Sequence, residues 1–213
     1  MKKTVWMAAA AGALLVFFAG GCGSAAPAGE RAPAQEAPKA AGEAAAPKQD
    51  GPKKMLILYY SLAGGNTKSI ADQLQQATGA DIERIEPQTP YSGSYDDIVA
   101  QGKREVDEGY RPALKALAHQ PEDYDIIAVG TPTWWYTMAP AVLTLLSEHD
   151  WSGKTIIPFQ THAGWPGHTL EDMQAAAPGA GFRYPLQVQF DHQALASPQA
   201  DIDSWLADVK TIL

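Results

Sequence analysis

Short apolar segments alternate with helical patterns along the chain from about residue 54 onward. The clearest of them, Met55 to Tyr60, is an unbroken apolar run, which is typical of a strand buried on both faces of a parallel sheet. Ile126 to Val129 and Thr155 to Phe159 have the same character. Asp81 to Glu86 is short and charged, and Leu186 to Phe190 alternates apolar with polar residues, so we expect both of these strands at sheet edges.

Between these segments, apolar residues recur at the spacing of an amphipathic helix. They form three stripes: Ile70, Leu74 and Ala77; Val142, Leu145 and Leu146; Ile202, Trp205, Leu206, Val209 and Leu213. Residues 87–120 exceed one crossover connection, and we expect a loop near Pro90, a helix from about Asp96 to Asp107 and a second short helix. Alternating strands and helices predict an α/β domain over residues 54–213, with a doubly wound five-stranded parallel sheet in the order 2-1-3-4-5 and helices on both faces.

The N-terminus has the features of an export signal. Lys2 and Lys3 precede an uncharged stretch from Val5 to Gly21, and the only cysteine of the chain, Cys22, follows directly. This arrangement resembles a bacterial lipobox, so we expect residues 1–22 to be a lipoprotein-type signal and Cys22 to be lipidated. A plain secretory signal cleaved near Ala26, or an uncleaved anchor, is the alternative. A lone cysteine cannot form an intramolecular disulfide or a thiolate metal cluster, and we expect no metal site.

Residues 23–53 differ from the rest in composition. They contain 11 Ala and 5 Pro and no aromatic or branched aliphatic residue. Such a segment cannot bury enough apolar surface to fold, so we expect a disordered linker that holds the domain away from a membrane. Together with the signal, the linker predicts an extracytoplasmic location with a lipid anchor in the membrane.

The charge of the domain restricts its partners. Residues 54–213 hold 10 Lys and Arg against 20 Asp and Glu, a formal charge of −10, whereas the whole chain carries −8. A domain this acidic is repelled by nucleic acid, which we exclude as a partner, and it is attracted to basic patches on proteins. The acidity could equally serve solubility alone.

Three loops that follow predicted strands carry the candidate chemistry, because ligands of open α/β sheets bind beyond the carboxyl ends of the strands. Residues 61–67 (SLAGGNT) combine glycines with hydroxyl and amide donors, which suits a phosphate, although Asn66 or Thr67 could simply cap a helix. Residues 131–136 (TPTWWY) place three aromatic side chains on a loop, which suits stacking on a flat ring, although a tryptophan could instead cover the core. Residues 161–168 (THAGWPGH) allow close backbone approach to a heterocycle, or form a plain turn.

With these loops the chain resembles the flavodoxin family, and in particular bacterial flavodoxin-like proteins. The matching motifs are Tyr60-Ser61, Gly65-Asn66-Thr67, Thr131-Pro132 with Trp134-Trp135, and Gly164-Trp165-Pro166-Gly167. The resemblance implies FMN as cofactor and transfer of one or two electrons to a redox protein or a small-molecule acceptor. Reduction of quinones with a nicotinamide is a further activity of such relatives, in which His162 or His168 could donate a proton.

The resemblance also implies which residues hold FMN. Those of the first loop would bind its phosphate, and those of the second and third loops would line its isoalloxazine ring. The expected cofactor-binding residues are Ser61, Gly64, Gly65, Asn66, Thr67, Thr131, Pro132, Thr133, Trp134, Trp135, Thr161, His162, Ala163, Gly164 and Gly167. The first loop is one residue longer than the usual family pattern. This difference motivates an alternative function, an extracytoplasmic binding module with a flavodoxin fold that has lost FMN.

Overall fold

The computed structural model of the chain describes residues 53–62 and 65–213. The predicted signal with Cys22, the linker up to residue 52 and Gly64 lie outside the described residues. Within the described part, no helix combines the length and the apolar composition needed to cross a membrane.

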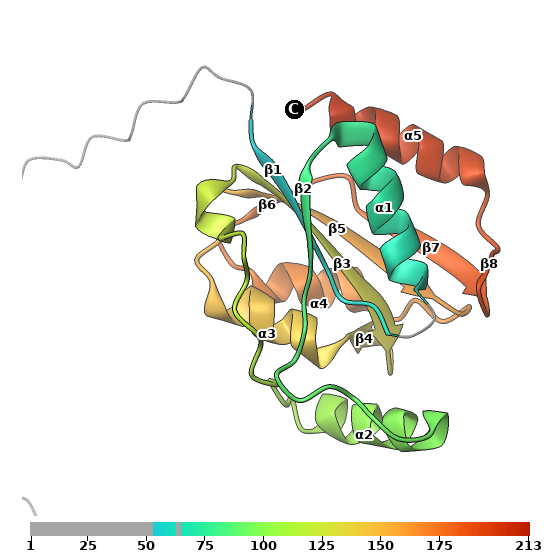
Figure 1. Ribbon diagram of the computed structural model, residues 1–213. Coiled ribbons are helices and arrows are strands. Elements are labelled where there is room, and N and C mark those ends of the chain that lie inside the picture. Colours follow the sequence, from blue (N-terminus) through green and yellow to red (C-terminus); the bar gives the residue numbers. More distant parts are fainter. Residues whose placement is uncertain (1–52, 63–64) are drawn as a thin grey trace, which may run out of the picture. The chain divides into compact units, whose positions relative to one another are not determined.

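The core of the domain is a parallel sheet with the predicted strand order (Figure 1). Its five longer strands are β2 (Asp81–Arg84), β1 (Met55–Tyr59), β3 (Ile126–Trp134), β5 (Thr155–His162) and β7 (Leu186–Asp191). They lie side by side in the order β2-β1-β3-β5-β7, which confirms the predicted order 2-1-3-4-5. Three two-residue strands were not predicted: β4 (Thr137–Met138), β6 (Gly181–Phe182) and β8 (Ala194–Leu195).

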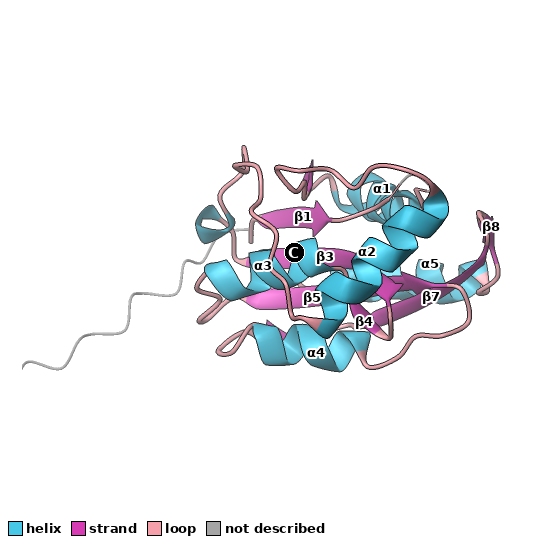
Figure 2. Cartoon of the chain, turned by 90° about the horizontal axis from the view of Figure 1, so that it is seen from below, coloured by secondary structure: helices cyan, strands magenta, loops and turns pink. Residues whose placement is uncertain are grey.

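Helices cover both faces of the sheet, as predicted (Figures 1 and 2). Strand β1 shows why, because its side chains alternate between two separate hydrophobic clusters. Ile57 packs on the side of α1 (Asn66–Thr78) and α5 (Gln199–Lys210). Leu58 packs on the side of α3 (Pro140–Glu148) and α4 (Thr169–Ala176). A strand buried on both faces in this way must be apolar at every position.

Helix α2 (Tyr95–Asp107) covers neither face and lies beyond the carboxyl ends of the strands (Figure 1). It begins with a capping box, in which the Ser94 hydroxyl accepts from the Asp97 N–H and the Asp97 carboxylate accepts from the Ser94 N–H. Gly102 is its only fully buried residue. Its position makes α2 a wall of the space where ligands of such sheets bind.

Two expectations about helices were wrong. In the described structure, residues 108–120 contain no helix and run partly extended beside residues 86–88, where the Gln88 N–H donates to the Ala113 carbonyl and the Lys115 N–H to the Glu86 carbonyl. Backbone pairing thus satisfies the polar groups of this long connection. Leu213 lies beyond the end of α5 and is 39% exposed, so it does not belong to the apolar stripe of that helix.

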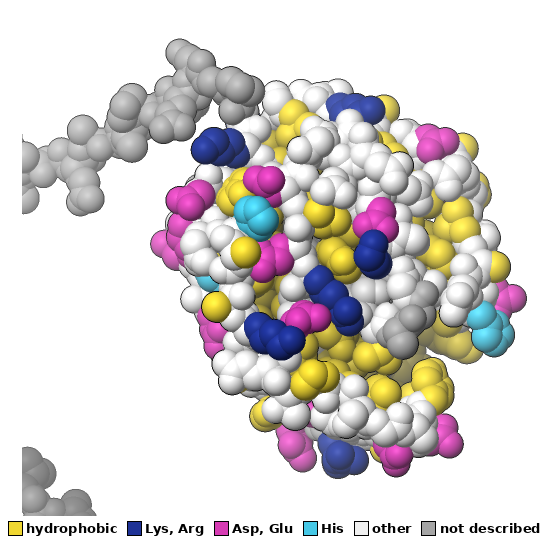
Figure 3. Space-filling view, viewed as in Figure 1, with side chains coloured by type: hydrophobic (Ala, Val, Ile, Leu, Met, Phe, Trp, Pro, Cys, Tyr) yellow, Lys and Arg dark blue, Asp and Glu magenta, His cyan; other side chains and the backbone are white. Residues whose placement is uncertain are grey.

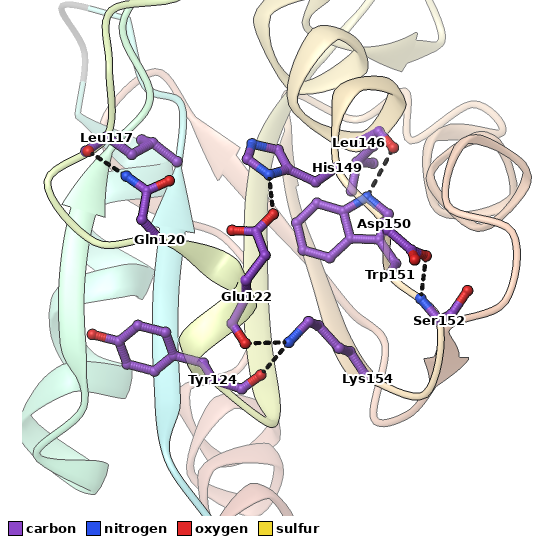
Figure 4. Close-up of polar contacts among 10 residues, drawn as sticks. All are labelled: Leu117, Gln120, Glu122, Tyr124, Leu146, His149, Asp150, Trp151, Ser152 and Lys154. Carbon is purple, nitrogen blue, oxygen red and sulfur yellow. Dashed lines mark hydrogen bonds and ion pairs between the residues drawn. The ribbon is translucent and has the colours of Figure 1, made fainter. Parts of the chain in front are cut away.

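Polar contacts fix the opposite, amino-terminal end of the sheet (Figure 4). The Lys154 ammonium, just before β5, donates to the carbonyls of Glu122 at 2.9 Å and Tyr124 at 2.7 Å, on the short 3-10 helix Pro121–Asp123 and its end. The carboxylate of Glu122 contacts His149 at 2.8 Å, and this bond lowers the pKa of Glu122. These bonds join the starts of β3 and β5 at the end of the sheet farthest from the three candidate loops.

Candidate functional site

The first predicted loop leads into α1 with a backbone shape that suits an anion. Gly65 adopts a left-handed conformation with φ of 73°, and its N–H donates to the Leu62 carbonyl at 3.0 Å. Helix α1 begins at the next residue, and no side chain of the described residues caps it. The first N–H groups of α1 therefore lack a side-chain acceptor, and an anion could accept from them.

A cavity of about 180 Å³ opens beside this loop and brings residues of all three predicted loops together. Its lining residues are Ser61, Leu62, Gly65, Asn66, Thr67, Pro132, Thr133, Thr161, His162 and Ala163. The buried hydroxyls of Thr67 and Thr161 are 2.8 Å apart and join the first loop to the third. Only one of the two can donate in this bond, so the other hydroxyl hydrogen is available to a ligand.

Asn66 lines the same cavity, but its side chain is engaged elsewhere. The amide group donates to the His192 carbonyl at 2.7 Å, at the tip of the hairpin formed by β7 and β8. In the described structure, the Asn66 side chain therefore links α1 to this hairpin.

A second, larger cavity of about 410 Å³ lies next to the first. Leu62, Thr133 and Ala163 line both cavities. The other lining residues of the larger one are Tyr95, Ile98, Val99, Gly102, Trp134, Trp135, Tyr136 and Trp165. Figure 3 shows a hollow with hydrophobic side chains between the body of the domain and α2. The arrangement offers a polar compartment for an anion next to an aromatic compartment for a flat ring.

The two neighbouring tryptophans have different positions. Trp134 is half-buried and packs edge-on against Tyr60 and Tyr91, with ring centroids 5.7 and 5.0 Å away. Gly102 of α2 lets this indole approach, because a β-carbon there would lie 3.1 Å from the Trp134 ring. Trp134 thus packs between α2 and the core and also forms one wall of the cavity. This agrees with the alternative interpretation of the loop, in which one tryptophan covers the core.

Trp135 is 42% exposed, and the Lys103 ammonium lies 5.4 Å from its ring centroid. Trp135 and Tyr136 form the two-residue turn between β3 and β4, with φ of 49° and 69°. Both residues are left-handed, as a type I′ turn requires, although side chains other than Asn, Asp or Gly pay a conformational cost there. The turn holds the Trp135 indole at the rim of the larger cavity.

The third loop is fixed by one carbonyl group and one glycine. The Pro166 carbonyl accepts from Thr169 at 2.9 Å and from the Gln160 amide at 3.3 Å. Gly167 has φ of 60°, and a β-carbon there would lie less than 3.0 Å from the backbone of Tyr136. The second and third loops therefore touch through their backbones at a point that only glycine permits.

Thr131 and Gly164, like Gly167, do not line either cavity in the described structure. The Thr131 hydroxyl is buried, donates to the Pro132 carbonyl at 2.9 Å and accepts from the Ala139 N–H at 3.0 Å, so it fixes the start of α3. Gly164 is exposed with φ of 103°, and its N–H donates to His162 Nδ1 at 3.1 Å. Both residues shape the loops around the cavities.

His162 lines the smaller cavity. Burial lowers the pKa of its imidazole below the ordinary value of 6.5. Because Nδ1 accepts from Gly164, the ring proton lies on Nε2, which can donate to a ligand. His168, in contrast, is bonded to Asp172 at 2.5 Å and lines neither cavity.

Several lining residues were not among the predicted site residues. Trp165, 66% exposed, belongs to the third loop, which was expected as a whole to line the flavin ring, although Trp165 was not among the individually named residues. Tyr95, Ile98 and Val99 belong to α2, whose existence the sequence predicted and whose position it did not. In the sequence, only the apolar character of these three residues could have indicated that they line a cavity. An apolar face on a helix must contact some other surface.

The two cavities fit FMN by their chemistry. None of the described residues that line the smaller cavity is acidic, while hydroxyls and the start of α1 supply donors for a phosphate. The larger cavity is lined mainly by aromatic and aliphatic side chains, which suits the isoalloxazine ring. Bound there, FMN would supply the transfer of one or two electrons, and the residues described above would position and desolvate it.

The open sheet and the two joined cavities at its carboxyl ends define a class of nucleotide-binding α/β proteins, and comparison with known proteins identifies the family. The chain belongs to the flavodoxin family, whose model matches residues 54–198. No curated protein sequence matches the chain.

Solved structures share the fold. A candidate flavoprotein from Bacteroides eggerthii DSM 20697 has 24% identity and a TM-score of 0.61, over 74% of this chain and 98% of its own. Another from Bacteroides uniformis ATCC 8492 has 23% identity and a TM-score of 0.63, over 74% and 99%. A flavoprotein from Lactobacillus acidophilus NCFM in complex with FMN has 19% identity and a TM-score of 0.56, over 72% and 98%. These likenesses confirm the flavodoxin-like fold, and the family supports FMN as the cofactor.

Proposed function

We propose that this chain is an FMN-binding electron-transfer module. The main observation behind this proposal is that a donor-rich cavity suited to an anion lies next to an aromatic cavity suited to a flat ring, with Leu62, Thr133 and Ala163 lining both. The arrangement supports a ligand with a phosphate at one end and a flat ring at the other, as FMN has.

The protein's own residues would then set the flavin environment. The Trp135 indole at the rim would lie against the ring and limit its contact with water. The domain charge of −10 would disfavour the anionic reduced flavin and so lower its reduction potential. Electrons would pass to a redox partner protein or to a small-molecule acceptor that reaches the exposed rim.

The test is flavin uptake by the purified protein. We expect one FMN per chain, absorbance bands near roughly 370 and 450 nm, and quenched flavin fluorescence when the ring stacks on an indole. A protein that remains colourless at tens of micromolar FMN would contradict the redox function and favour a binding module with the same fold.

We also propose that the module is tethered outside the cytoplasm by a lipid on Cys22, with residues 23–53 as spacer. The single cysteine after an uncharged stretch and the Ala- and Pro-rich composition support this proposal. Mass spectrometry of the processed protein should find a lipid-sized increment on Cys22.

A further inference from the structure

Arg84 contacts the first loop from outside the cavities. It is the last residue of the edge strand β2, and its Nη2 donates to the Ser61 carbonyl at 2.6 Å, across 23 residues of sequence. Ser61 is buried and lines the smaller cavity, whereas the Arg84 side chain is 47% exposed. A guanidinium group is therefore fixed directly behind the loop that faces the expected phosphate.

The direction of this bond matters for anion binding. In a trans peptide the carbonyl and the N–H point in opposite directions, so a Ser61 carbonyl turned toward Arg84 turns the Leu62 N–H away from it. Leu62 lines both cavities. The Leu62 carbonyl is also occupied, because it accepts from the Gly65 N–H at 3.0 Å. Both carbonyls are thus held by donors, and neither is free to repel an anion.

The charge of Arg84 adds to this effect. A charged donor polarises the peptide group whose carbonyl it binds, and this strengthens the N–H at the other end of that group as a donor. The neighbouring cations are engaged differently: Lys68 is paired with Asp72 at 2.6 Å and Lys115 with Glu86 at 2.7 Å. Arg84 reaches Glu86 only at 3.8 Å, so its close contact is with the loop. Figure 3 shows basic and acidic side chains interspersed on the face that carries α1 and the edge strand.

We propose that Arg84 is a positioning residue for the phosphate loop, which orients and polarises the Ser61–Leu62 peptide and so selects phosphorylated flavin over riboflavin. The inference rests on the proposed function, since it assumes that the smaller cavity holds the FMN phosphate. The residue acts through the backbone of the loop and need not touch the ligand.

The experiment compares the dissociation constants of FMN and riboflavin in the full-length protein by fluorescence titration. For Arg84→Gln we expect the FMN constant to rise about tenfold and the riboflavin constant to change less than about threefold, as for loss of one charge-assisted bond. Arg84→Lys keeps the charge without the planar fork and should lie between wild type and Arg84→Gln. Lys115→Gln is the matched control, because it removes a charge from the same edge without touching the loop, and it should leave both constants unchanged.

Inorganic phosphate serves as a second probe, which distinguishes failure of the Arg84 proposal from failure of the proposed function. Millimolar phosphate should raise the melting temperature of the apo-protein in the wild type more than in Arg84→Gln. Suppose that the wild type binds FMN. If Arg84→Gln then has the same FMN dissociation constant, or if its FMN and riboflavin constants rise equally, the role of Arg84 is refuted and the proposed function stands. If Lys115→Gln loses FMN as strongly as Arg84→Gln, general surface charge explains the effect and the positioning role is refuted. If wild type binds neither FMN nor phosphate, the proposed function itself fails.

Discussion

Replacement of Gly167 by Ala tests the contact between the second and third loops. Two costs are expected. Alanine at φ of 60° costs about 1–2 kcal/mol because its β-carbon crowds the local backbone. The same β-carbon would lie less than 3.0 Å from three backbone atoms of Tyr136, so the two loops must move apart, and such overpacking costs about 1–3 kcal/mol more.

The chain contains a matched control for this substitution. Gly109 also has φ of 60°, but nothing lies within 4 Å of a β-carbon placed there. Gly109→Ala is therefore destabilised only by the unfavourable backbone conformation, and part of this cost is offset by the lower entropy of the unfolded chain. The difference between the two variants isolates the steric cost at the loop contact.

Guanidinium chloride unfolding of both variants measures that difference. We expect the unfolding free energy of Gly167→Ala to be lower than that of Gly109→Ala by about 1–3 kcal/mol. FMN affinity should fall only in Gly167→Ala, because the separated loops line the ring cavity. Equal stability of the two variants would refute the close contact between the loops.

Three further outcomes are expected. Thr67→Ala should weaken FMN more than riboflavin in titrations, because its hydroxyl lies at the phosphate cavity, and equal weakening would contradict that assignment. Since burial lowers the pKa of His162, the folded chain binds fewer protons there than the unfolded chain just below pH 6.5, so the unfolding free energy should rise with pH through this window. His162→Asn should flatten that rise, and an unchanged slope would exclude the effect. Cys22→Ala should release the protein from membranes on fractionation, and a variant that stays equally membrane-bound would exclude lipidation as the tether.

The sequence predicted the sheet because buried parallel strands must be apolar at every position, and Met55 to Tyr60 satisfy this rule without tertiary information. The three ligand loops could be predicted for a related reason, since they directly follow such strands. Helix α2 was expected, but its place beyond the strand ends depends on contacts such as that of Gly102 with Trp134, which no local pattern encodes.

Turns and side-chain directions were the least predictable features. The hairpin of β3 and β4 turns at Trp135 and Tyr136, where the usual signals of Asn or Gly are absent, so tertiary contacts must impose it. The Asn66 amide has its acceptor 126 residues away, at His192. Likewise, the hydrogen bond from Arg84 to the Ser61 carbonyl depends on the register of β2 beside β1, which the sequence does not show.

The position of α2 has a consequence for how quickly a bound cofactor could leave. Only Gly102 of this helix is fully buried, and neither of the two hydrophobic cores includes a buried residue of α2. We therefore expect α2 to open locally more readily than the sheet unfolds, so its amide hydrogens should exchange with solvent faster than those of β1. Because α2 forms a wall of the ring cavity, the residence time of the flavin would follow the opening rate of this one helix rather than the unfolding rate of the domain.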